Sequence, residues 1–265
     1  MRVLDLFSGL GGWSAPFIDA GDEVTRVEID PRFTAELHAD ILTLTADDLP
    51  GPWDLILASP PCEGFSVMNI GKNWYHDGTP KTAKAALALS LVTHTLDLIR
   101  ELDPTFWILE NPRDKLRVLP VVAGLERRTV TYCHYGEQRM KPTDLFSDRW
   151  PPALELAPAC RNGDPCHVRA PRGSRTGTQG FGDYWEKSVV PYPLAQAVRD
   201  GVAASLCECG HEIAAHQTGE GPWTGFCGAD MDCPCESPSS SDAPESRSRL
   251  WVEMDAPTVA RKIAR

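Results

Sequence analysis

Residues 3–12 read VLDLFSGLGG, and this stretch decides the fold because an apolar run passes directly into a glycine-rich segment. Residues 3–7 have the composition of a short buried strand, and the segment at 13–20 is helix-like. A glycine-rich turn between a strand and a helix lets the backbone approach a ligand and presents free helix amides. Many α/β proteins need such a turn for packing alone, so other residues must support a binding role.

Strand-like and helix-like segments alternate over the first 110 residues. Further strands are expected at 23–28, 55–58 and 105–109, and helices at 33–38 and 81–102. Such alternation predicts a parallel sheet with helices on both faces. Later in the chain we expect a helix at 118–125, a strand at 128–135, a helix at 193–205 and a short helix at 256–265. Residues 150–175, rich in Pro, Gly, Arg and Cys, indicate an irregular region.

The length of 265 residues allows one large domain, or one domain with a small appendage. No apolar run approaches the length of a membrane-spanning helix, and Met1 leads almost directly into a strand, which leaves no room for a signal peptide. We therefore expect a cytoplasmic protein. The nine cysteines are an odd number and several cluster with histidines, which favours metal binding over disulfides.

The net charge of −11 is unusual for a protein that binds nucleic acid, but the average hides a pattern. Residues 107–187 carry 13 basic and 10 acidic side chains, whereas both flanking regions are acidic. The middle region is therefore the best candidate for a surface that faces phosphate, although charge alone fits an ordinary solvated face equally well.

A second informative stretch is SPPCEGFS at 59–66, where one cysteine follows a diproline. The preceding run at 53–58 is typical of a buried parallel strand, and functional groups collect at the carboxyl ends of such strands. Prolines fix φ and remove backbone donors, so the Cys62 thiol is expected on a stiff loop. A lone cysteine is more often a small buried hydrophobic residue than a nucleophile, so Cys62 needs support from other residues.

Acidic residues after the second strand complete a pocket for an adenosine-containing ligand. Glu28 ends that strand, and a carboxylate at this position typically accepts hydrogen bonds from ribose hydroxyls. Asp40 and Ile41 are placed to contact an adenine from the next loop. The glycine-rich turn lacks the Gly-Lys-Ser/Thr ending of a triphosphate-binding loop, so we expect a ligand without a triphosphate.

With these residues in order, the chain resembles the cytosine carbon-5 methyltransferases, which use S-adenosylmethionine. The matching motifs are DLFSGLGG (5–12), Glu28, Asp40, PPCEGFS (60–66), ENP (110–112), QGFGD (179–183) and SVVP (188–191). They follow the family's order and cover roughly residues 1–205. The resemblance implies an α/β fold with a Rossmann-like class I methyltransferase sheet, and DNA as the substrate.

The resemblance also implies a role for each site residue. Cys62 would add to carbon 6 of a flipped-out cytosine, so that carbon 5 can attack the sulfonium methyl group. Glu110 would hold ring nitrogen 3 and the exocyclic amine and donate a proton, which requires a raised pKa that burial can supply. Arg139 would contact the cytosine carbonyl, with Lys141 as the alternative. The implied cofactor-binding residues are Phe7, Ser8, Gly9, Gly11, Gly12, Glu28, Ile29, Asp40, Ile41, Pro60 and Ser188.

Three positions depart from the family pattern. Glu63 stands where the family usually has Gln, and Pro112 replaces the Val of Glu-Asn-Val. The sequence QRMK at 138–141 only approximates the family's Gln-x-Arg-x-Arg. The stretch from there to residue 179 is short for a target-recognition domain, so we predict a short target sequence with fewer than five specified bases.

The expected organisation has five parts. They are a catalytic domain at 1–146, a target-recognition region at 147–177, a segment returning to the catalytic domain at 178–206, a zinc-binding module at 207–236, and a linker with a tail at 237–265.

Two Cys/His sets are candidate structural zinc sites, because zinc takes four nitrogen or sulfur ligands in a tetrahedron. The first offers seven possible ligands in 29 residues, and its Cys-x-Cys spacing does not indicate a standard finger. Its members are Cys207, Cys209, His211, His216, Cys227, Cys233 and Cys235. We expect the metal ligands to come from this set, with His211 left out. The second set is Cys133, Cys160, Cys166 and His167, and most of it lies in the recognition region, where a short segment with little core needs a staple.

Other functions remain open at this point. The same chemistry acts on tRNA, so an RNA cytosine methyltransferase fits the motifs. An exocyclic-amine methyltransferase would have an aromatic residue where Cys62 stands, and a catalytically silent DNA-binding protein would not need both Cys62 and Glu110. Glu110 has a structural alternative as a loop carboxylate capping Arg113. A compact, monomeric enzyme of this kind would fit a bacterium or its phage, and a restriction-modification setting.

Overall fold

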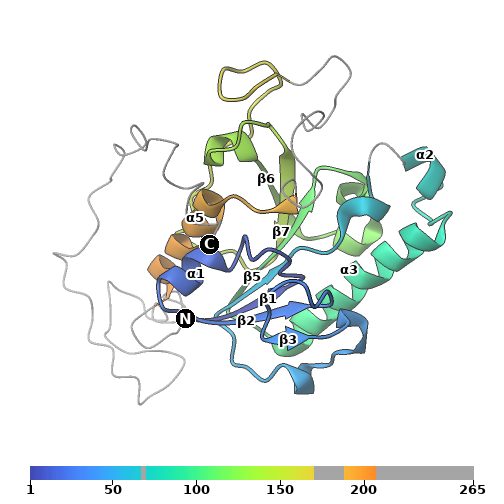
Figure 1. Ribbon diagram of the computed structural model, residues 1–265. Coiled ribbons are helices and arrows are strands. Elements are labelled where there is room, and N and C mark those ends of the chain that lie inside the picture. The colour runs from blue at the N-terminus through green and yellow to red at the C-terminus, as the bar shows by residue number, and fades with distance from the viewer. Residues whose placement is uncertain (67–69, 170–187, 207–265) are drawn as a thin grey trace, which may run out of the picture. The chain divides into compact units, whose positions relative to one another are not determined.

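The computed structural model describes residues 1–66, 70–169 and 188–206, and a seven-stranded sheet forms their centre (Figure 1). The strand order is β3-β2-β1-β4-β5-β7-β6. The strands are β1 (Arg2–Leu6), β2 (Glu23–Glu28), β3 (Leu37–His38), β4 (Leu55–Ala58), β5 (Phe106–Pro112), β6 (Glu126–Thr131) and β7 (Pro142–Ser147). Neighbours from β3 to β5 are parallel, whereas β7 runs antiparallel to β5 and β6. The expected α/β sheet is confirmed, and it is mixed rather than wholly parallel.

Helices cover both faces of the sheet, as the alternation predicts. The helices α1 (Ala15–Asp19) and α5 (Tyr192–Ser205) lie on one face and α3 (Ala83–Leu102) lies on the other, with a short α2 at Ile70–Asn73 (Figure 1). The 3₁₀ turns are η1 (Ile41–Thr43), η2 (Ala46–Asp48), η3 (Cys62–Gly64), η5 (Lys115–Val118), η6 (Pro120–Val122) and η7 (Tyr132–Tyr135). Among the described helices, none combines the length and the apolar character needed to cross a membrane.

The helix α3 is delimited by residues that suit its two ends. The Thr82 hydroxyl accepts a hydrogen bond from the Ala85 amide at 3.2 Å and so caps the first turn. At the other end Asp103 adopts a left-handed conformation with φ of 45°, which stops the helix. The helix therefore begins two residues later than the apolar periodicity predicts, and ends where expected.

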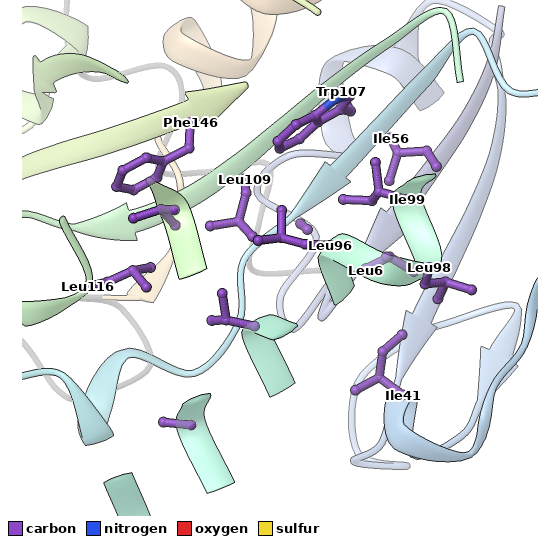
Figure 2. Close-up of a cluster of buried hydrophobic side chains, with 14 of the residues drawn as sticks. Leu6, Ile41, Ile56, Leu96, Leu98, Ile99, Trp107, Leu109, Leu116 and Phe146 are labelled. Atoms are coloured by element: carbon purple, nitrogen blue, oxygen red, sulfur yellow. The ribbon is translucent and has the colours of Figure 1, made fainter. Parts of the chain in front are cut away.

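Two hydrophobic cores lie on opposite faces of the sheet because successive strand residues alternate between them. On the α3 face, Leu6, Ile56 and Leu109 from neighbouring strands pack with Leu96 and Ile99 of the helix (Figure 2). The other face packs against α1 and α5 through a set that includes Val3, Leu55, Leu57, Ile108, Phe17, Leu194 and Val198. Each buried Leu or Ile stabilises the fold by about 1.5–3 kcal/mol. The sheet is thus a firmly packed base for the loops at its carboxyl edge.

Two expected helices were wrong. Residues 33–38 form a turn followed by β3, because the Glu36 carboxylate accepts hydrogen bonds from the Arg26 amide and guanidinium at 2.8 and 2.9 Å and holds this segment extended beside β2. Residues 118–125 form 3₁₀ turns instead of an α-helix. Pro120 has no amide hydrogen for a helical bond, and Gly124 has φ of 92°.

The antiparallel strand β7 was not foreseen, and the strand expected at 128–135 is shifted to 126–131. All six β7 residues are buried, and they include Thr143 and Asp144, so no alternation of polar and apolar residues marks the strand. The last four residues of the expected strand form η7, which ends at Gly136 with φ of 89°. The short helix expected at 256–265 lies outside the described residues.

Candidate active site

Cys62 lies in η3, on the loop that follows β4 at the carboxyl edge of the sheet. The loop is fixed against α3, since a Cβ atom on Gly64 would overlap with the Cβ atom of Ala88. The Asn73 amide and the Trp74 indole both donate hydrogen bonds to the Gly64 carbonyl, at 3.1 and 2.8 Å. Cys62 itself is half-buried. The thiol therefore sits on a stiff loop, as the diproline predicts, and outside the hydrophobic cores.

Glu110 reaches the same edge from β5, the neighbour of β4, and the structure brings the two sequence-predicted residues together. The Asn111 side-chain amide donates a hydrogen bond of 3.0 Å to the Pro60 carbonyl. This bond links the Glu-Asn-Pro motif to the loop of Cys62 across two parallel strands. Asn111 belongs to the Glu-Asn-Pro motif, but the sequence alone does not indicate this contact.

The Glu110 carboxyl group is buried and surrounded by polar partners. The Tyr132 hydroxyl donates to Glu110 Oε1 at 3.2 Å, and the Ser59 side chain also hydrogen-bonds to it. Burial raises the pKa of Glu110, while the charge of Lys141 and the two hydrogen bonds oppose this rise. The direction is the one that a proton-donating carboxylic acid requires. Tyr132 lies in η7, a turn for which the sequence carries no recognisable signal.

Lys141 and Arg139 come from the segment between η7 and β7, and both are buried. Lys141 has a left-handed backbone with φ of 30°, and its Nζ lies 4.3 Å from the centre of the Tyr132 ring. Arg139 Nε lies 3.3 Å from Glu137 Oε2. Burial lowers the pKa of Lys141, and the negative charges of Glu110 and Cys62 oppose this change. The buried positive charge of Lys141 is therefore directed at the pair of candidate catalytic residues.

The Cys62 thiol is protonated in the free protein at neutral pH. Burial and the neighbouring Glu110 charge raise the pKa of Cys62 to about 11, whereas Lys141 lowers it. A sulfur in this state is unreactive until its proton leaves.

Glu63, next to the candidate nucleophile, pairs with Lys84 in the first turn of α3. Both side chains are largely exposed to solvent. This replacement of the family's usual Gln therefore adds an ion pair at the rim of the site.

The glycine-rich turn and the end of β2 are joined by Glu28. Its carboxylate accepts hydrogen bonds from the Gly9 amide at 2.8 Å and from the Asp30 amide at 3.0 Å. Phe7, Gly9 and Gly11 all have positive φ, so the turn curls its backbone in a way that favours glycine. Glu28 is thereby fixed in place, and its carboxylate oxygens retain lone pairs that a ligand hydroxyl can use.

The other expected cofactor-binding residues surround this turn. The Ser8 hydroxyl is buried without a hydrogen-bond partner, and Ile29 is 63% exposed. Asp40 uses its side chain to cap η1, accepting from the Leu42 amide at 3.0 Å. Ile41 is 4% exposed and packs in the core on the α3 face, so only its backbone is free to meet a ligand.

Gly12 and Ser188 come from distant parts of the chain that meet at the turn. A Cβ atom on Gly12 would lie 2.8 Å from the backbone nitrogen and oxygen of Val190, so this position must be glycine for the two segments to touch. Ser188 is exposed at the start of the same returning segment. The buried Ser8 hydroxyl without a partner, the fixed Glu28 carboxylate and the exposed Ile29 side chain fit a nucleoside ligand such as S-adenosylmethionine.

The two predicted metal sets have different outcomes. Cys207, Cys209, His216, Cys227, Cys233 and Cys235 lie outside the described residues. The second set is brought together, with the ligand atoms of Cys133, Cys160, Cys166 and His167 all within 4.8 Å of one another.

The sheet order, the glycine-rich turn and the strand-end site define a class I methyltransferase fold. A family model described as C-5 cytosine-specific DNA methylase matches residues 1–116. A probable DNA (cytosine-5)-methyltransferase of Frog virus 3 (isolate Goorha) is 31% identical over 162 residues, which cover 56% of this chain and 71% of the viral protein. The chain belongs to the C-5 cytosine-specific DNA methylase family.

The chain matches only part of each of two bacterial relatives. The Type II methyltransferase M1.HphI of Haemophilus parahaemolyticus is 30% identical over 128 residues, which cover 42% of this chain and 32% of the relative. The Type II methyltransferase M.AplI of Arthrospira platensis is 28% identical over 193 residues, which cover 63% of this chain and 52% of the relative. The matched part therefore spans about a third and about half of these two proteins.

Proposed function

We propose that this chain is a DNA (cytosine-5-)-methyltransferase that moves a methyl group from S-adenosylmethionine to carbon 5 of cytosine. The observation that carries the proposal is the placement of Cys62 and Glu110 at adjacent strand ends, joined by the hydrogen bond from Asn111 to Pro60. A thiol and a carboxyl group with a raised pKa, placed on neighbouring strands, suit nucleophilic addition to a cytosine ring together with proton donation to it.

Cys62 and Glu110 act together in the first step. The Cys62 sulfur forms a bond to carbon 6 as its proton passes to solvent water, and the electron pair of the 5,6 double bond moves to make carbon 5 nucleophilic. Glu110 donates its proton to ring nitrogen 3 and so neutralises the ring as the sulfur adds. Its burial raises the pKa of Glu110, which favours the protonated form that this step requires.

Lys141 and Tyr132 stabilise the negative charges that this step creates. The Lys141 charge lowers the pKa of Cys62 and stabilises the Glu110 carboxylate that proton donation leaves behind. The Tyr132 hydroxyl donates to that same carboxylate. We assign Arg139 to the cytosine carbonyl because it is a buried cation of the same segment.

S-adenosylmethionine, held by the turn at 7–12 and by Glu28, supplies the electrophilic methyl group. Gly9 and Glu28 fix the shape of that turn, and Ile29 offers an apolar surface to a base. The return of the ring to its aromatic state requires three changes: carbon 5 loses its proton to solvent, the Cys62 sulfur departs, and nitrogen 3 returns its proton to Glu110.

A base inside a duplex is out of reach of Cys62, so the target cytosine must leave the stack. The name of the viral relative and the description of the matching family support DNA as the substrate. The short recognition region favours a target with fewer than five specified bases. Methylome sequencing of cells that express the protein checks this expectation, and five or more specified bases would contradict it.

The proposal is tested with the full chain, tritium-labelled S-adenosylmethionine, and DNA and RNA substrates side by side. We expect label in DNA, loss of that label in Cys62→Ser, and a loss of at least 100-fold in Glu110→Gln. Leu87→Ala, which removes an exposed apolar side chain of α3, is the control with unchanged activity. Label in RNA alone would favour the RNA enzyme, and equal labelling by Cys62→Ser and the parent would overturn the covalent mechanism.

A further inference from the structure

The cluster of Cys133, Cys160, Cys166 and His167 joins two separate parts of the chain. Cys133 lies in η7, while the other three residues come from the segment at 151–169, which forms no helix or strand. Cys133 Sγ lies 3.2 Å from Cys160 Sγ and 3.6 Å from Cys166 Sγ. His167 Nδ1 lies 3.6 Å from Cys160 Sγ and 3.4 Å from Cys166 Sγ. Four potential ligand atoms thus face a common centre.

We propose that these four residues bind one structural zinc ion. In a zinc tetrahedron, two sulfurs lie about 3.8 Å apart, and a sulfur and a nitrogen about 3.6 Å, given zinc bonds of about 2.3 and 2.0 Å. The Cys133–Cys166 distance of 3.6 Å and the two distances from His167 Nδ1, 3.6 and 3.4 Å, lie close to these values. The Cys133–Cys160 distance of 3.2 Å is shorter, so these two sulfurs must move apart to bind the ion. Three sulfurs and one imidazole complete the coordination and leave no open position, so the site is structural rather than catalytic.

The segment at 151–169 is anchored at its start, where Leu154 is buried and the Ala153 and Ala157 amides donate to Ser205 Oγ and to the Tyr135 hydroxyl at 3.0 and 2.9 Å. Its second half, 158–169, needs a staple because none of its residues is buried. The Cys160 amide donates to Thr131 Oγ1 at 3.1 Å, and the Val168 amide donates to the Gln138 carbonyl at 2.8 Å. These bonds place the ligands but contribute about 1 kcal/mol each, whereas a bound zinc ion makes its binding energy part of the folding energy.

The location ties the metal to the active site. Cys133 directly follows Tyr132, whose hydroxyl donates to Glu110. The Val168 amide bonds to Gln138, which directly precedes Arg139. The zinc ion therefore fixes the recognition segment against the turn that supports Glu110 and against the candidate cytosine-binding arginine.

A disulfide between Cys133 and Cys160 is the main competing arrangement, but it would not involve Cys166 or His167. Cys166 Sγ also lies 3.6 Å from Cys133 Sγ, and His167 Nδ1 lies 3.4 Å from Cys166 Sγ, which a disulfide does not explain. Binding through Nδ1 puts the ring proton on Nε2, so it costs the 3.3 Å contact from the Gly163 amide to His167 Nε2. That single weak contact is a small loss against four metal bonds.

The test measures zinc per chain in the purified full-length protein and in three variants. Cys166→Ser and His167→Ala should each lose one equivalent of zinc relative to the parent, whereas His167→Cys should keep it because sulfur replaces nitrogen as the fourth ligand. Cobalt substitution of the parent should give a thiolate charge-transfer absorption that Cys166→Ser loses. The readouts do not depend on methyl transfer, so they stand apart from the proposed function.

Cys235→Ser is the matched control, since it removes a cysteine of the other candidate set and should leave this equivalent in place. Equal zinc in the parent and Cys166→Ser would overturn the proposal, as would loss of zinc in Cys235→Ser alone. A mass two hydrogens lower for the Cys133–Cys160 peptide pair would overturn it in favour of the disulfide.

Discussion

The side-chain amide of Asn111 donates a hydrogen bond to the carbonyl oxygen of Pro60 at 3.0 Å, and this bond sets the spacing between the Glu110 strand and the Cys62 loop. Both groups are buried, so neither can exchange the partner for water. We therefore propose that Asn111 is a positioning residue, which fixes the geometry of Cys62 and Glu110 without touching the base.

Asn111→Asp tests this role, because it keeps the size of the side chain and replaces the donor by a second acceptor. Two buried acceptors that face each other without a hydrogen cost about 1–3 kcal/mol, and if this cost falls on the arrangement of the reacting groups, kcat drops by about 5- to 160-fold. The KM for S-adenosylmethionine should stay within twofold of the parent, because the turn at 7–12 is untouched. Steady-state methyl transfer measures both constants, and an unchanged kcat would show that the bond does not position Cys62.

The raised pKa of Cys62, about 11, predicts that its thiol reacts slowly with iodoacetamide at pH 7–8 and steadily faster up to the highest pH that the fold survives. The alkylation rate of the Cys62 peptide, followed by mass spectrometry across pH, gives the titration directly. A plateau reached below pH 9 would contradict the buried, protonated state of the thiol.

Two variants separate the charges that act on Cys62. Glu110→Gln removes a negative neighbour and should shift the alkylation profile to lower pH. Lys141→Met removes the positive neighbour and should shift the profile to higher pH. Shifts of the same sign in both variants would mean that folding changes, rather than charge, control the reactivity.

The sequence allowed the central part of the site to be predicted because chemistry and chain order coincide there. Cys62 follows the apolar strand β4, and Glu110 follows the apolar residues of β5 near the carboxyl end of that strand. Parallel neighbouring strands place their carboxyl ends together. Two strands, 23–28 and 55–58, were predicted at their observed bounds. In these places the local pattern and the tertiary structure demand the same conformation.

The remaining contacts could not be predicted because they depend on long-range packing. Tyr132 reaches Glu110 only because the chain turns at η7 and returns as β7, a strand whose residues are buried on both faces and carry no period. The segment at 33–38 has a helix-like pattern, yet pairing of Glu36 with Arg26 holds it as an edge strand. Tertiary contacts override weak local preference at both positions.

The buried Asp5 predicts a pH-dependent stability. Burial raises the pKa of Asp5 from its ordinary 3.8 to about 7, against a hydrogen bond from the Ser14 hydroxyl that lowers it. Between about pH 4 and 7 the folded protein keeps a proton that the unfolded chain has lost, so stability falls as pH rises, by up to about 4 kcal/mol in total. Urea unfolding across this range measures the fall.

Asp5→Asn should flatten this dependence, because an amide of the same shape does not titrate and can still accept from Ser14. Asp97→Asn is the control, because it removes an exposed carboxylate of α3. If Asp5→Asn and the parent lose the same stability from pH 5 to pH 8, the side chain is not the group that takes up the proton.

The Glu63–Lys84 ion pair should influence DNA binding more than folding. Both side chains are largely exposed, so the pair contributes at most about 1 kcal/mol to stability. Glu63 adds a negative charge next to the loop that must approach a DNA backbone in the proposed function. Glu63→Gln should therefore tighten DNA binding a few-fold at low salt, and Lys84→Gln should weaken it by a similar factor, with both effects shrinking as salt rises.

Fluorescence anisotropy with labelled duplex at two salt concentrations measures the change, while thermal unfolding checks that Tm hardly moves. Weaker binding by Glu63→Gln would mean that the carboxylate serves DNA binding by holding Lys84 in position, since loss of that ion pair would then outweigh the loss of repulsion.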